Sequence, residues 1–201
     1  MSGRFILASQ SPRRRELLDR LGIPFVCVPA EFEERCDPTL PPQLAVSELA
    51  RHKAAAVRRR CGQNDWVLAA DTMVVCGGRM LGKPANTEQA RQMLRSLSGA
   101  WHEVMTGLAL IAPSGRLWQG VEITRVHVLA MDDRAIDAYI ATGEPMDKAG
   151  AYGIQGGAAA YIDRIEGSYD NVVGLPLARL RAMLAEAESK EANEVDQSAA
   201  Q

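Results

Sequence analysis

The fold is indicated by how the chain changes character across residues 5–22, FILASQSPRRRELLDRLG. Phe5–Ala8 is a short apolar run, which predicts a buried strand. Ser9–Ser11 is polar, and Pro12 suits the first turn of a helix. The helix carries three leucines on one face and is expected to end near Gly22. The stretch therefore predicts a strand, a turn and a helix in succession, which is typical of α/β proteins.

Strand and helix patterns continue to alternate early in the chain, while hairpin patterns dominate its middle. Further strands are expected at residues 24–28, 66–71, 74–81 (a hairpin), 104–112, 117–129 and 158–165. Further helices are expected at residues 44–60, 87–97, 132–141 and 175–187, with Thr87 as the cap of the second. The order predicts an α/β fold with a mixed, strongly twisted sheet flanked by helices. Residues 1–187 are expected to form one catalytic domain, and residues 188–201, polar and without periodicity, a disordered tail.

The composition narrows the class of protein. The chain has 201 residues, 47% of them hydrophobic, and a net charge of −2, which favours a globular protein over a non-specific nucleic-acid binder. Its four cysteines form no CxxC pair and have no histidine at zinc spacing, so reduced thiols are expected. No window approaches the ~20 apolar residues of a membrane span, and the N-terminus does not read as a signal peptide. We therefore expect a cytoplasmic protein without a membrane partner.

The turn at residues 9–15, SQSPRRR, is the first candidate site. A helix N-terminus offers unpaired N–H groups and a partial positive charge, which Ser9 and Ser11 extend with hydroxyl groups. Arg13 and Arg14 add guanidinium groups that bind phosphate with two hydrogen bonds. The alternative is an ordinary helix cap followed by a solvated basic turn. Arginine in a first turn opposes the helix dipole, which favours a bound anion.

Asp71 and Thr72 form the second candidate, expected at the carboxyl end of an apolar strand, where α/β proteins often bind ligands. A carboxylate there can hold a divalent metal or accept a proton from water. The alternative is an aspartate that caps the next segment. Glu34, in an acidic stretch at residues 31–34, is a candidate for binding Mg²⁺ or Mn²⁺, although acidic loop residues are more often simply solvated. Lys53 and Lys83 are candidate phosphate ligands, with solvated lysine as the alternative.

The last candidate is the segment 147–157, DKAGAYGIQGG, in which six of eleven residues are glycine or alanine. Such a segment lets the backbone approach a ligand closely. Gln155 offers both a donor and an acceptor, which suits the edge of a nucleotide base. The alternative is a flexible connector, but a connector has no need of so many polar side chains.

Four of these segments, taken in order, resemble the Maf family. They are ILASQSPRR at 6–14, ADT at 70–72, GKP at 82–84 and KAGAYGIQG at 148–156, with SG at 98–99 and VGLPL at 173–177 as further matches. The resemblance runs from about residue 5 to residue 185. It implies a fold related to inosine triphosphate pyrophosphatases, with two lobes around a cleft. It also implies cleavage of a nucleoside triphosphate to the monophosphate and pyrophosphate, with Mg²⁺ or Mn²⁺ as cofactor.

The resemblance assigns roles to individual residues. Asp71 matches the family's proton acceptor, and with Glu34 it is expected to place the metal. The triphosphate is expected to be held by Ser9, Ser11, Arg13, Arg14, Lys53 and Lys83. Arg13, Thr72 and Gln155 match positions that separate the dTTP/UTP branch from the 7-methyl-GTP branch, where SPWRR, SDQ and a glutamate are typical. One departure is Gly157-Ala158, where relatives often carry a bulkier residue followed by glycine.

The expected activity is thus hydrolysis of dTTP and UTP, with CTP and modified pyrimidine nucleotides as further candidates. The resemblance also suggests a role in clearing the nucleotide pool and a link to cell-division arrest. Two rival functions stay open: a nucleotide-binding regulator of division with residual hydrolysis, and a triphosphatase that releases single phosphates. The sequence leaves the oligomeric state open, with a homodimer among the options.

Overall fold

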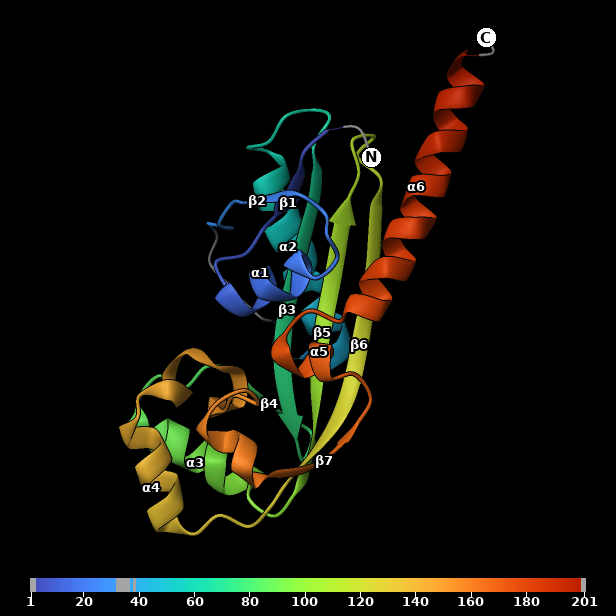
Figure 1. Cartoon of the computed structure of the whole chain (residues 1–201). Coiled ribbons are helices and arrows are strands. Elements are labelled where there is room, and N and C mark those ends of the chain that lie inside the picture. The colour runs from blue at the N-terminus through green and yellow to red at the C-terminus, as the bar shows by residue number, and fades with distance from the viewer. Residues whose placement is uncertain (1–2, 32–36, 38, 200–201) are drawn as a thin grey trace. The chain divides into compact units, whose positions relative to one another are not determined.

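The computed structural model describes residues 3–31, 37 and 39–199 (Figure 1). Its strands are β1 (Phe5–Leu7), β2 (Phe25–Cys27), β3 (Trp66–Cys76), β4 (Arg79–Leu81), β5 (Trp101–Ile111), β6 (Leu117–Val128) and β7 (Ile162–Glu166). Its α-helices are α1 (Pro12–Asp19), α2 (Pro42–Arg58), α3 (Thr87–Leu97), α4 (Asp133–Ala141), α5 (Tyr169–Val173) and α6 (Leu177–Ala199). Three short 3-10 helices, η1 (Glu144–Asp147), η2 (Ala149–Ala151) and η3 (Gly157–Tyr161), lie between α4 and β7.

The strands of the described residues form a seven-stranded mixed sheet in the order β2-β1-β3-β5-β6-β7, with β4 paired to β3. β1 runs parallel to both β2 and β3. The β3–β4 and β6–β7 pairs are antiparallel. The prediction of an α/β fold with a mixed sheet and flanking helices is confirmed.

The chain divides into two units. The first unit contains the residues up to Asp71, Gly107–Val121 and the residues from Gly174 onward, and the second contains Thr72–Thr106 and Glu122–Val173. The strands β3, β5 and β6 contribute residues to both units. The chain passes from the first unit to the second between Asp71 and Thr72. The prediction that residues 1–187 act as one catalytic domain stays a prediction.

The core of the first unit joins α2 to the sheet. Small and β-branched side chains from both make up a buried cluster: Ile6, Ala8, Ala50, Ala54, Val57, Val67, Ala69, Ala109 and Ile111. α2 lies so close to β5 that a Cβ atom added at Gly107 would stand 2.5 Å from the Val46 carbonyl oxygen. This close approach places α2 directly against the sheet. Lys53 lies about two turns after Val46 on the same helix.

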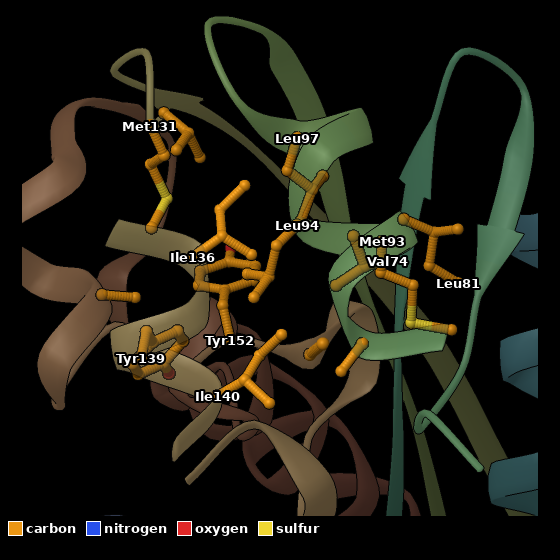
Figure 2. Close-up of a cluster of buried hydrophobic side chains, with 14 of the residues drawn as sticks. Val74, Leu81, Met93, Leu94, Leu97, Met131, Ile136, Tyr139, Ile140 and Tyr152 are labelled. Atoms are coloured by element: carbon orange, nitrogen blue, oxygen red, sulfur yellow. The ribbon is translucent and has the colours of Figure 1, made fainter. Parts of the chain in front are cut away.

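The core of the second unit lies between α3, α4 and the strands, and α3 and α4 pack side by side (Figure 1). Figure 2 shows side chains from these helices, from β3 and β4 and from residue 152 converging on one cluster. Asn86 caps α3 by accepting a hydrogen bond from the Gln89 N–H at 2.9 Å, so the predicted cap at Thr87 is wrong by one residue. Asp132 caps α4 in the same way through the Ala135 N–H at 2.8 Å.

Both predicted hairpins are present. Gly77 and Gly78 have φ values of +54° and +75°, which is the backbone of a two-residue turn that matches the twist of paired strands. They join β3 to β4 with Cys76 opposite Arg79. The second hairpin joins β5 to β6, where Ala112 N donates to Arg116 O at 3.0 Å.

The prediction that a strand ends at Asp71 is wrong, because β3 continues to Cys76. β1 pairs only with Trp66–Leu68, and β4 pairs with Val74–Cys76, so β3 exchanges one partner for another along its length. Asp71 therefore lies in the middle of a strand, past the end of its parallel pairing with β1.

Two other boundaries differ from the prediction. β7 begins at Ile162, because residues 157–161 form η3. α6 continues to Ala199, past the end predicted at Ala187. Residues 186–193 are rich in alanine, glutamate and lysine, which favour helix without an apolar repeat, and Lys190 bonds Glu186 one turn earlier at 2.5 Å. Within the described part of the chain, no helix combines the length and the apolar composition that a bilayer crossing requires.

Candidate active site

The turn between β1 and α1 is ordered by its own serines. Ser9 Oγ accepts a hydrogen bond from the Ser11 N–H at 3.1 Å. Ser11 is the N-cap of α1, and its Oγ accepts from the Arg14 N–H at 3.5 Å. Pro12 occupies the first helical position, as predicted. The turn thus has the geometry of a helix N-terminus that can receive an anion.

The three arginines of this turn differ in their surroundings. Arg13 and Arg14 are half-buried, whereas Arg15 is exposed. Arg14 Nε donates to the carbonyl oxygen of Gly174 at 2.8 Å, which joins two segments that are 160 residues apart. The first turn of α1 contains no acidic residue. The N-terminus of a helix carries a partial positive charge, so this turn can receive an anion.

Lys53 and Asp71 meet inside the first unit. Lys53 comes from α2 and Asp71 from β3, and their relative exposures are only 9% and 7%. Lys53 Nζ and Asp71 Oδ1 form a hydrogen-bonded ion pair. Removing two charges from water costs several kcal/mol per ion, so a buried pair is weak evidence for a purely stabilising role. The role of the pair stays a prediction.

The register of β1 and β3 relates this pair to the serine turn. Leu7 is opposite Leu68 in the parallel ladder, and Ala8 N donates to Leu68 O at 2.7 Å. Ser9 follows β1, and Asp71 stands three residues beyond Leu68, about 10 Å further along the strand. The serine turn and Asp71 therefore both lie beyond the same end of the parallel pairing between β1 and β3.

Thr72 begins the second unit and faces away from Asp71, because neighbouring residues of a strand alternate between its faces. Its Oγ1 lies 2.9 Å from Thr106 Oγ1. Thr106 Oγ1 also lies 3.2 Å from Asn171 O, which can only accept a hydrogen bond. A threonine hydroxyl can both donate and accept, so Thr72 offers either function to a further partner.

Asn171 supports this arrangement and was missed by the sequence reasoning. It is fully buried, and its Nδ2 donates to Val104 O and to Thr124 Oγ1, both at 2.9 Å. These partners are 67 and 47 residues away, so no local pattern could reveal the network. The nearest sequence signal was the VGLPL segment that follows at residue 173.

In the second unit the segments around Lys83 and Gln155 lie together. Gly150 N donates to Gly82 O at 3.0 Å, which fastens the GKP segment to the glycine-rich one. Gly150 has a φ of +69°, and a Cβ atom there would lie 3.0 Å from the Val74 side chain. Lys83 and Gln155 are both exposed. The two segments thus present these side chains to solvent on a fixed backbone.

The comparisons with known proteins agree with the motifs. Residues 4–187 match the family described as Maf-like protein. The chain belongs to the Maf family. A dTTP/UTP pyrophosphatase from Anaeromyxobacter dehalogenans (strain 2CP-C) is 50% identical over 189 residues, which are 92% of this chain and 94% of that one. A dTTP/UTP pyrophosphatase from Gloeobacter violaceus is 49% identical over 187 residues, covering 92% and 97%.

Among solved structures, a HAM1 protein from Coxiella burnetii aligns over 92% of this chain and 99% of its own, at 17% identity and a TM-score of 0.48.

The Maf motifs divide between the two units. The first unit holds Ser9, Ser11, Arg13, Arg14, Lys53 and Asp71, and the second holds Thr72, Lys83 and Gln155. Within each unit the structure brings the motif segments together, as described above. Glu34, the predicted metal ligand, lies outside the described residues. The individual roles of these residues stay predictions.

The donor set of the Maf site fits a metal that arrives with a nucleotide. Among the described residues, no group of three or more His, Cys, Asp and Glu side chains is placed to hold an ion. Mg²⁺ in enzymes of phosphate chemistry is usually held by one or two carboxylates together with substrate phosphates. Asp71 is one such carboxylate, and Glu34 is the second candidate. A metal bound in this way does not need a coordination sphere made only of protein ligands.

Three cysteines, Cys27, Cys61 and Cys76, lie within the described residues, and all three are free thiols. Burial raises the pKa of both Cys61 and Cys76, which disfavours the reactive thiolate. Cys36 lies outside the described residues.

Proposed function

We propose that this chain hydrolyses dTTP and UTP to the nucleoside monophosphate and pyrophosphate. The observation that carries the proposal is the buried Lys53–Asp71 pair beside the serine turn of the first unit. Two further observations support the proposal. Relatives at about half identity over most of the chain are named dTTP/UTP pyrophosphatase. The Maf motif residues of that branch are present at Arg13, Thr72 and Gln155.

The first unit is proposed to bind the phosphate groups of the substrate. The N–H groups at the start of α1, the hydroxyls of Ser9 and Ser11 and the guanidiniums of Arg13 and Arg14 are all donors. Lys53 adds an ammonium group beside Asp71, and Lys83 of the second unit adds another cation. These groups match the charge and the acceptor oxygens of a triphosphate.

In the proposed reaction, Asp71 accepts a proton from the water that attacks the α-phosphorus. The new phosphorus–oxygen bond forms as the bond from the α-phosphorus to its bridging oxygen breaks, and pyrophosphate leaves with that oxygen. A phosphate oxygen that attracts Lys53 would release Asp71 Oδ1 from the ion pair for this task. Asp71, with Glu34, would hold Mg²⁺ or Mn²⁺, which supplies positive charge to neutralise the phosphates.

The second unit is proposed to select the base. Uracil and thymine each present an N–H donor between two carbonyl oxygens. The Thr72 hydroxyl and the Gln155 amide each offer a donor and an acceptor for these groups. Arg13 is proposed to contribute to the same selection. CTP and modified pyrimidine nucleotides are further substrates to test.

The test is a panel of nucleoside triphosphates with Mg²⁺ or Mn²⁺, in which pyrophosphate and phosphate release are scored separately. The proposal expects pyrophosphate from dTTP and UTP, and little from GTP. Release of single phosphates would establish the triphosphatase instead. Tight nucleotide binding without turnover would favour a regulatory protein. A pyrophosphatase would suit the clearing of unwanted nucleotides, and its effect on cell division is testable by deletion of the gene.

A further inference from the structure

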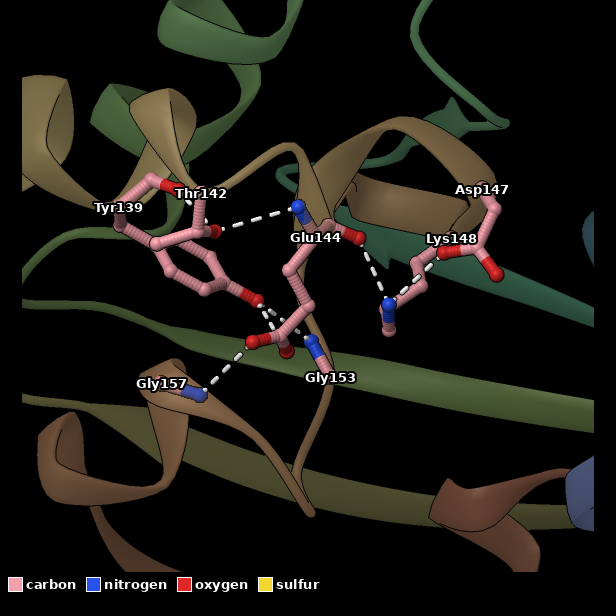
Figure 3. A network of polar contacts seen from close by, with 7 residues as sticks. All are labelled: Tyr139, Thr142, Glu144, Asp147, Lys148, Gly153 and Gly157. Atoms are coloured by element: carbon pink, nitrogen blue, oxygen red, sulfur yellow. Dashed lines mark hydrogen bonds and ion pairs between the residues drawn. The ribbon is translucent and has the colours of Figure 1, made fainter.

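We infer that Glu144 is a positioning residue that holds the loop 153–157 in the shape that presents Gln155. The inference rests on the proposed function, because it gives Gln155 the task of reading the base. Both carboxylate oxygens of Glu144 are used as acceptors. Oε1 accepts from the Tyr139 hydroxyl at 2.9 Å, and Oε2 accepts from the Gly157 N–H at 2.9 Å (Figure 3).

Tyr139 connects Glu144 to the residues that precede Gln155. Its hydroxyl donates to Glu144 and accepts from the Gly153 N–H at 3.1 Å. Glu144 is therefore bound to Gly157 directly and to Gly153 through one hydroxyl. These two glycines stand two residues before and two residues after Gln155, so the carboxylate brackets the loop from both ends.

The Glu144 carboxylate occupies the space beside Gly156, where an added Cβ atom would overlap it. The φ of Gly156 is −116°, which other residues adopt easily, so a side chain at this position would displace the carboxylate without straining φ. At Gly153, a Cβ atom would lie 2.6 Å from Cε of Lys148, whose Nζ donates to the Glu144 backbone oxygen at 2.6 Å.

The Tyr139 and Glu144 side chains that hold the loop are attached to the core of the second unit. Tyr139 is 5% exposed and belongs to the buried cluster of Figure 2. Burial raises its pKa well above the usual value, so the hydroxyl keeps the proton that it donates. Thr142 Oγ1 accepts from the Glu144 N–H at 3.1 Å and donates to Tyr139 O at 2.6 Å. Glu144 is thus held by its backbone as well as by its carboxylate.

The consequence is a loop in which the Gln155 side chain is exposed. Ile154 is buried and Gln155 is exposed, so the bracketed backbone turns one side chain inward and the next outward. A glutamine at position 144 would have the same shape but only one acceptor oxygen, and its NH₂ group would face an N–H or O–H donor. The substitution Glu144→Gln therefore loosens one end of the loop without emptying space.

The first experiment compares Glu144→Gln with the matched control Glu166→Gln, which removes an exposed ion pair with Arg125 on β6 and β7. Hydrogen exchange of the Gly153 and Gly157 amides is followed by NMR, and KM and kcat are measured for dTTP and GTP. Glu144→Gln is expected to speed exchange of at least one of the two amides and to raise KM for dTTP about tenfold, with a smaller change in kcat. Preference for dTTP over GTP should fall. Unchanged exchange, or an unchanged KM and preference, would overturn the inference.

The second experiment is a double-mutant cycle with Gly156→Ala. Alone, the added methyl group should displace the Glu144 carboxylate and raise KM for dTTP as Glu144→Gln does. In the Glu144→Ala background, Gly156→Ala should add little, because the obstructing carboxylate is gone. Effects that simply multiply would contradict the inference. If the wild-type protein releases no pyrophosphate from dTTP or UTP, the proposed function is wrong, while amide exchange still decides the role of Glu144.

Discussion

The ammonium group of Lys53 and the carboxylate of Asp71 form a buried ion pair within the first unit, although they are 18 residues apart on a helix and a strand. Apolar residues of similar size would stabilise a fold equally well or better at such a place. The pair joins a potential base to a cation that can also bind phosphate. The proposed role of the pair can be tested at either residue.

Asp71→Asn is expected to fold and to lower kcat for pyrophosphate release by about 10²–10⁴-fold, the usual effect of removing a positioned acid–base group. Asparagine keeps an oxygen acceptor for Lys53 but accepts no proton. The rate is measured with dTTP at saturating Mn²⁺, and folding is checked by thermal unfolding. Asp137→Asn, which removes an exposed ion pair with Arg91, is the control. Turnover near that of the wild type would remove Asp71 from the role of base.

Gln155→Glu is expected to weaken use of dTTP and UTP, because a carboxylate replaces the amide donor by a second acceptor. The specificity constants for dTTP, UTP and GTP are compared with those of Gln119→Glu. Gln119 is exposed in the first unit, where it bonds Ser47. Equal selectivity in both variants would show that Gln155 does not read the base.

Gly107→Ala is expected to destabilise the protein by about 1–3 kcal/mol, the usual cost of overpacking, because the new methyl group would press on the backbone of α2. Since α2 carries Lys53, activity should fall as well. Gly120→Ala is the control: its Cβ atom would meet only the flexible side chains of Arg179 and Met183, at 3.2 Å. Denaturant unfolding measures both variants. Similar losses in the two would contradict the close packing of α2 at Gly107.

Acid should weaken the fold through His102. Burial, with a smaller effect of His127, lowers the pKa of His102 from 6.5 to about 4. The unfolded chain binds this proton more readily, so the free energy of unfolding should fall by roughly 3 kcal/mol as the pH drops from about 6.5 towards 4. Asp65, whose pKa the Arg4 hydrogen bond lowers from 3.8 to about 2, acts only at lower pH.

Unfolding is measured against pH for the wild type and His102→Gln. The variant should lose less stability between pH 6.5 and 4, although it also loses the 2.7 Å bond from the ring to Tyr152. Parallel curves over that interval would show that His102 does not cause the acid sensitivity.

Features with local causes could be predicted from the sequence. The serine turn, the proline at the start of α1 and the Gly77-Gly78 hairpin follow from residue types at neighbouring positions. The continuity of β3 from Trp66 through Asp71 into this hairpin was not predicted, because the polar residues Asp71 and Thr72 interrupt the apolar run. Nor was the extent of α6, since helix propensity without an apolar repeat resembles a polar tail.

The candidate site was predicted in part for the same reason. The motif segments indicated candidate substrate-binding residues, but not the residues that bond to those segments. Asn171, Thr106 and Glu144 act through partners that only the tertiary structure brings near. Such residues carry no short-range signature, since a buried amide or a bracketing carboxylate looks like any other polar residue in a loop.

The bracketing of Gln155 by Glu144 and Tyr139 has a consequence for protein engineering. The nine-residue motif at 148–156 is not a portable module, because its shape is imposed from α4 and from η1. A graft of the motif alone onto another scaffold should lose its geometry. A graft that begins at Tyr139 would keep the bonds made by Tyr139 and Glu144, but it would also need a replacement for the hydrogen bond from Gly150 N to Gly82 O.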